Sequence, residues 1–187
     1  MASLLDLVKE HLGPQELSQI SQQLGTDQST TQQAVNAALP ALVGGVANTA
    51  QQPQGTSTIQ QLIGSHSDVL GSLGSLLGAG APADGGSILG RILGHNQQEV
   101  QQGVQQASGL GSDQTRKLLM ILAPIVMGAL ARRAMSHGNA NDPAEIQKSL
   151  QQDGQQAKQQ AEAHSPHLGG LLGKIMSAAE SPEMRNR

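Results

Sequence analysis

The segments VNAALPALVGGVA (35–47) and LMILAPIVMGALA (119–131) decide the fold, because they are one element written twice. Pro40 and Pro124 lie 84 positions apart, and Gly44 and Gly128 share the same offset. The apolar positions of both segments recur at spacings of i, i+4, i+7, i+8 and i+11, which is the stripe of one face of an α-helix. We therefore expect an all-α protein that contains two related bundles, each with a long proline-bearing helix at its centre.

A second motif supports the duplication. The segment SLLDLV (3–8) returns as SILGRI (87–92), and a third version, GLLGKI (170–175), follows 83 residues after the second. This spacing predicts two tandem helical repeats of about 84 residues and a partial third. We place their boundaries at 1–86, 87–169 and 170–187.

The two prolines are expected to kink their helices. A proline inside a helix removes one backbone donor and crowds the carbonyl four residues earlier, which costs ~3 kcal/mol or more. Here those carbonyls belong to Asn36 and Met120. Because both copies contain the proline, we interpret the kink as part of the structure. The glycines one turn later predict a packing notch for a neighbouring helix.

Capping signals and periodicity place the other helices. Ser3 is the expected N-cap of the first, Thr26 or Asp27 of the first long helix, and Ser112-Asp113 of the second, whereas Gly25 and Gly109 end helices. The segment 151–163 is rich in Gln and Ala and polar all round, so it is either an exposed helix or partly disordered, and we favour a helix. The expected elements are helices at 3–12, 15–24, 27–50, 96–107, 112–136 and 168–179, short helical pieces over 56–77, a flexible linker over 78–86, and closure of the second long helix at His137-Gly138.

The second long helix differs from the first in being apolar on almost every side. Leu118, Ile121, Leu122 and Ile125 extend its stripe around the helix, and Gly128 adds the notch. A helix that is apolar all round must be buried on every side. These five residues therefore form either the centre of the monomer or an interface between copies, and they are our candidate interface.

Composition excludes several classes of function. The 187 residues include no Phe, Trp, Tyr or Cys, which removes base-stacking platforms, thiolate metal sites and cysteine nucleophiles. A net charge of −3 leaves no basic surface of the kind that binds nucleic acid. The longest apolar run, 118–131, is shorter than the ~20 residues that cross a bilayer. No secretory signal precedes it, so we expect a cytoplasmic protein.

No arrangement of reactive residues stands out. His164 and His167 lie three apart, but two imidazoles without a third ligand make a weak metal site. The run Ser65-His66-Ser67-Asp68 contains the residue types of a catalytic triad, which needs proximity in space rather than in sequence. The glycine-rich segment 71–74 lacks the Lys-Ser/Thr of a phosphate-binding loop. We expect no catalytic, cofactor-binding or metal-binding residues, and hence no enzyme.

The combination of LPALVGGVA (39–47), APIVMGAL (123–130) and HLGG (167–170) resembles the bacterial proteins of unknown function related to YidB, the domain of unknown function family 937. The resemblance covers roughly residues 3–176. It implies a small all-helical protein with a core comparable to homeodomain-like bundles. It implies no activity, cofactor or catalytic residue.

Three functional hypotheses remain at this point. The first is a non-enzymatic helical scaffold that associates with itself or with another protein, without a small-molecule substrate. The second is a nucleic-acid-binding homeodomain-like bundle, which the negative charge opposes. The third is a membrane-associating or toxin-like protein that inserts the segment 118–131.

Overall fold

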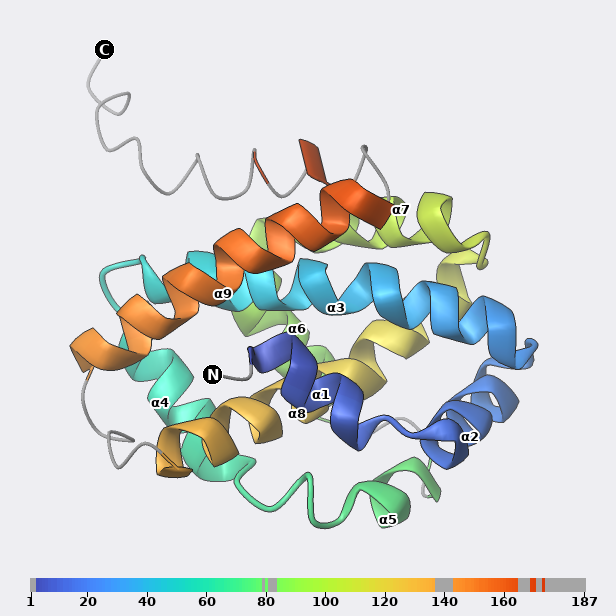
Figure 1. Ribbon diagram of the computed structural model, residues 1–187, viewed down its shortest axis with the longest axis horizontal. Helices are drawn as coiled ribbons and strands as arrows, with labels where there is room; N and C mark the ends of the chain where they lie inside the picture. Colours follow the sequence, from blue (N-terminus) through green and yellow to red (C-terminus); the bar gives the residue numbers. More distant parts are fainter. Residues whose placement is uncertain are drawn as a thin grey trace.

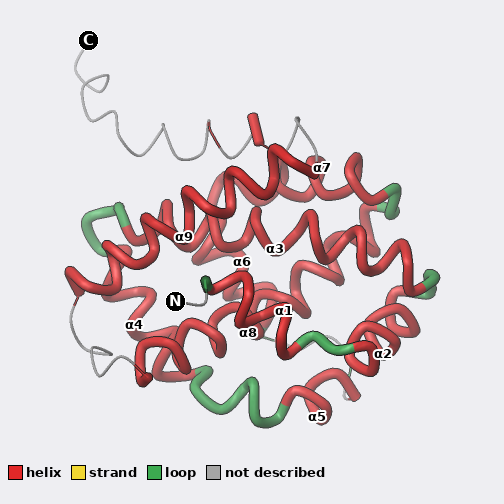
Figure 2. Tube along the Cα trace, in the orientation of Figure 1, coloured by secondary structure: helices red, strands yellow, loops and turns green. Residues whose placement is uncertain are grey.

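The two proline-bearing segments form the two longest helices among the residues that the structure describes. The computed structural model describes residues 3–78, 80, 84–136, 143–164, 169, 170 and 173. Within these residues helix α3 spans Gln28–Ala50 and helix α8 spans Ser112–Ser136, and each is continuous through its proline. The described residues contain no β-strand (Figure 2). The prediction of an all-α fold is confirmed.

Shorter helices surround this pair in the order expected from the capping signals (Figure 1). The segment 151–163 lies within a helix, as we favoured. The remaining helices are α1 (Leu4–His11), α2 (Pro14–Leu24), α4 (Gly55–Ser65), α5 (Leu73–Gly78), α6 (Gly85–Leu93), α7 (Gln97–Ser108) and α9 (Pro143–His164), with a 3-10 turn at Gly94–Asn96. The predicted helix at 168–179, the closure at His137-Gly138 and most of the partial third repeat lie outside the described residues.

Local capping chemistry is found at four of the helix ends that the sequence singled out. Ser3 and Asp6 form a reciprocal capping box at the start of α1, and the Asp27 side chain accepts the N–H of Thr30 at the start of α3. Gly25 and Gly109 end α2 and α7 in the left-handed conformation, with φ of 66° and 73°. These expectations from the sequence are confirmed.

Two boundaries differ from the prediction. Helix α8 begins at Ser112 itself, because the Gly111 carbonyl accepts the first helical hydrogen bond and the Gln114 side chain accepts the Gly111 N–H at 3.0 Å. The prediction that Ser112-Asp113 caps this helix was therefore wrong by one residue. Helix α6 begins at Gly85, inside the segment that we predicted to be a linker.

The two halves of the chain share one core. A single cluster of buried apolar side chains includes residues from every helix between α1 and α9. Helices α1 and α6, which begin the two predicted repeats, each pack against both α3 and α8. The structure thus has one contiguous core, to which both of the related halves that we expected contribute.

The halves are also interlocked. Helix α9 follows α8 in the chain, yet it packs along α3 (Figure 1). Helix α7 likewise packs on α3, and the turn that follows α4 packs on α8. Each long helix is therefore covered partly by segments that belong to the other half.

Glycines in the long helices permit these close approaches. A Cβ added at Gly45 of α3 would lie 2.4 Å from the Leu93 side chain of α6. One added at Gly128 of α8 would lie 3.2 Å from Val69 in the turn after α4. The glycine segments of both long helices are packing notches in the protein's own core, as the sequence indicated.

Candidate interaction site along helix α9

The candidate interface on α8 lies in the interior of the monomer. Leu118, Ile121, Leu122 and Ile125 are each 0 % exposed, and Gly128 is buried as well. Periodicity left open whether these residues form the centre of the monomer or an interface between copies. In the structure they form the centre of the monomer. These five residues are not available to a second copy, and the proposed interface on this face of α8 loses its support. Met135 is the one exposed large apolar side chain among the described residues.

The prolines are buried with their helices. Proline has no N–H, so the Met120 carbonyl cannot accept the usual bond from residue 124. The first residue of α6 packs against this carbonyl, since a Cβ added at Gly85 would lie 2.2 Å from its oxygen. The freed carbonyl of α8 thus marks the place where α6 begins its contact. The kinks at Pro40 and Pro124 remain predictions.

His66 serves local structure at the end of α4. The His66 Nδ1 atom lies 2.9 Å from the carbonyl oxygen of Leu62, one turn earlier. Its position beside Ser65 and Asp68 therefore reflects helix termination rather than a triad. The described residues contain no group of three or more His, Cys, Asp or Glu side chains close enough to hold a metal ion. The His164 side chain and all of His167 lie outside what the structure describes.

A hollow of about 500 Å³ opens where α3 joins α4. The Thr49 hydroxyl donates to the Ile92 carbonyl at 2.8 Å, and the Thr58 hydroxyl donates to the Gln54 carbonyl at 3.1 Å. Both hydroxyl groups therefore already donate to backbone carbonyls. Arg91 is the only charged side chain among the residues that line the hollow. The lining residues are Thr49, Gln52, Pro53, Gln54, Gly55, Thr58 and Arg91.

Helix α9 presents a narrow buried stripe toward the core. Ile146, Leu150, Ala157 and Ala161 are at most 5 % exposed, and Asp153 is 3 % exposed within the same stripe. Small side chains on the second half of this helix let its backbone lie close to that of α3. The outer face of α9 is polar, and its exposed side chains include Gln151, Gln152, Gln155, Gln156 and Gln159.

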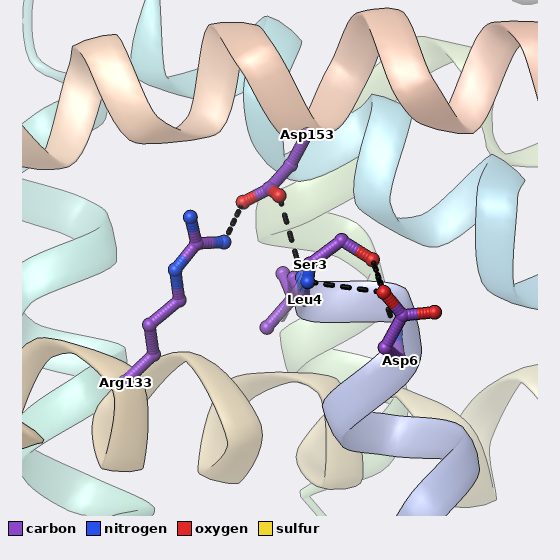
Figure 3. Close-up of polar contacts among 5 residues, drawn as sticks. All are labelled: Ser3, Leu4, Asp6, Arg133 and Asp153. Atoms are coloured by element: carbon purple, nitrogen blue, oxygen red, sulfur yellow. Dashed lines mark hydrogen bonds and ion pairs between the residues drawn. The ribbon is translucent and has the colours of Figure 1, made fainter. Parts of the chain in front are cut away.

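Asp153 joins three helices at the middle of this stripe (Figure 3). Its Oδ1 atom accepts the Leu4 N–H at 3.3 Å, and its Oδ2 atom forms an ion pair with Arg133 in the last turn of α8. A carboxylate is favoured at the positive N-terminal end of α1, and the guanidinium satisfies the other oxygen. Asp153 is thereby fully paired although it is buried.

Two further polar contacts lie around the same end of the bundle. The Lys9 ammonium of α1 donates to the Gln160 side chain of α9 at 3.2 Å. The Arg132 guanidinium donates to Nε2 of His11 at 3.3 Å, while Nδ1 of His11 lies 2.8 Å from the Leu7 carbonyl oxygen. This arrangement requires the tautomer with the proton on Nδ1. Helices α1, α8 and α9 are thus connected by polar contacts as well as by the core.

Two carboxylates have pKa values below their ordinary value because of capping. Side-chain and backbone hydrogen bonds to Ser3 lower the pKa of Asp6. The hydroxyls of Ser29 and Thr30, together with the Thr30 N–H, lower the pKa of Asp27 much further. Both groups stabilise the start of a helix, and neither lies beside a reactive partner.

By length and composition alone, α8 is sufficient to span a membrane. Of its most apolar 18-residue window, however, 72 % is buried inside the protein. The central helix of a folded core has the same composition, so this observation is weak evidence for a membrane span.

The family comparison covers the helices that α9 packs against. The family model described as "Bacterial protein of unknown function (DUF937)" matches residues 6–133, more than half of the chain. The chain belongs to the DUF937 family. No curated protein and no solved structure matches the chain. The resemblance that the sequence suggested is confirmed, and the function of the DUF937 family is unknown.

Helix α9 lies wholly outside the matched DUF937 region. Its main packing partner, α3, and its ion-pair partner, Arg133, lie inside that region. The sequence did not predict this site, because Asp153 lies in a segment whose pattern is polar all round. The available signal was the spacing of Ile146, Leu150 and Asp153 at i, i+4 and i+7 on one helical face.

Proposed function

We propose that this DUF937 protein is a non-enzymatic helical scaffold that acts by association with a second copy or with another protein. The observation that carries the proposal is the seating of α9 on α3. A helix beyond the family region occupies a long apolar face through small side chains and is held in place by one buried ion pair. Docking of an amphipathic helix in an apolar groove is a recurrent mode of protein–protein recognition.

The roles of the polar side chains support a non-enzymatic function. Ser3, Asp6 and Asp27 cap helices, and Arg133 and Asp153 pair with each other. The carboxylates of Asp6, Asp27 and Asp153 are therefore used for structure. We therefore propose that the protein uses no cofactor, metal or small-molecule substrate, and that it works in the cytoplasm.

Nucleic-acid binding is the second candidate, because α2–α3 and α7–α8 are helix pairs joined by short glycine-containing turns. In helix-turn-helix proteins the second helix of the pair enters the major groove. Here the second helices are enclosed, with continuous burial from Ala37 in α3 and from Ile121 in α8. Arg116 and Lys117 form the exposed basic pair at the start of α8. A mobility shift of duplex DNA that persists at 0.15 M salt would favour this alternative.

Membrane association is a third candidate, based on α8 alone. Insertion of α8 would require the shared core to open, since this helix packs against α1, α2, α3, α4, α6 and α7. Co-sedimentation with anionic phospholipid vesicles tests this alternative directly. Binding by the folded protein at neutral pH would favour it over the scaffold.

We also propose that the fold arose by tandem duplication, with the repeats bounded at residues 86 and 169. Helices α3 and α8 begin 84 positions apart, and so do the left-handed glycines that end α2 and α7. Thr31 and Thr115 have the same offset, are both 0 % exposed, and both donate their hydroxyl to the carbonyl four residues earlier. Superposition of residues 3–50 on 87–134 is the test. Failure of the three helices to match would overturn the duplication.

The scaffold proposal predicts association at accessible concentrations. Light scattering across a concentration series should give a native mass above the 19.3 kDa of one chain, or a protein partner that co-purifies in a fixed ratio. A mass of one chain at every concentration, together with the absence of any such partner, would overturn it.

A further inference from the structure

We draw no further inference here: the strongest candidate, the hollow between the end of α3, the start of α4 and Arg91 of α6, rests on a helix N-terminus without a side-chain cap and on one exposed arginine, and no second observation among the described residues points to a ligand there.

Discussion

Contact between Gly85 and the Met120 carbonyl leaves no room for a side chain at residue 85. An added Cβ at residue 85 would lie 2.2 Å from a backbone oxygen, which cannot move away as a flexible side chain can. We expect Gly85→Ala to lower the free energy of unfolding by about 1–3 kcal/mol through overpacking. Urea unfolding followed by circular dichroism at 222 nm measures the change.

Gly90, which lies in α6 as Gly85 does, provides the matched control. A Cβ added there meets nothing within 4 Å, and the residue is exposed. Gly90→Ala should therefore raise the free energy of unfolding by about 0.5–1 kcal/mol, as alanine replaces glycine inside a helix. A loss of stability at both positions would show that the Met120 contact is not the cause.

Asp27 makes the start of α3 sensitive to acid. Hydrogen bonds from Ser29 and Thr30 hold its folded-state pKa far below its unfolded value, so its stabilising contribution is complete above about pH 4 and is lost as the pH falls below that value. We expect Asp27→Asn to be less stable than the unaltered protein at pH 7 and the difference to narrow toward pH 2. Thermal melts at several pH values test this, and a constant difference would contradict it.

The capping residues at several helix ends could be predicted from the sequence alone. Ser3, Asp27, Gly25 and Gly109 were predicted correctly, since caps depend on side chains and dihedral angles within one turn. Asp153 was not predicted, because its two partners lie 149 and 20 positions away in the chain.

Helix α9 is the element whose anchoring depends most clearly on one residue. Asp153→Ala would leave Arg133 and the Leu4 N–H without their partner, and breaking a buried pair in this way costs roughly 3–5 kcal/mol. We expect amide protons of α9 to exchange faster with deuterium, with a smaller change in α3. Gln152→Ala on the exposed face is the control, and equal exchange of α9 in both variants would contradict the anchoring role.

The buried face of α9 shows why periodicity alone was insufficient for this element. Its first half follows the usual rule with Ile146 and Leu150, whereas its second half is buried through Ala157 and Ala161. Alanine adds little to an apolar stripe, so the pattern of 151–163 resembled that of an exposed helix. For α8 the pattern predicted burial correctly but contained no information about which surface covers the helix.

Taken as a whole, the molecule should unfold in one step, because both halves contribute to one core. Leu39 in the first half and Ile88 in the second are 0 % and 1 % exposed members of the same cluster. We expect Leu39→Ala and Ile88→Ala each to cost about 2–5 kcal/mol and to shift a single transition. Calorimetry should give equal van't Hoff and calorimetric enthalpies, and two separable transitions would contradict the shared core.

The sequence predicted the helices of this architecture. It did not predict that each long helix is covered partly by segments of the other half. Duplicated motifs such as Leu4-Leu5 and Ile88-Leu89 indicate equivalent elements, and two separate bundles satisfy that pattern as well as one interlocked core does. Tertiary contacts between segments far apart in the chain leave no mark in the local spacing of apolar residues.

Interlocking has a consequence for the newly made chain. Helix α3 ends at Ala50, but the helix that covers it is complete only at His164, which is 114 residues later. At 5–20 residues per second, the ribosome takes roughly 6–23 s to synthesise this interval. During that time the nascent polypeptide holds an apolar surface without its natural cover. Protection by a chaperone would be of greatest value in this interval.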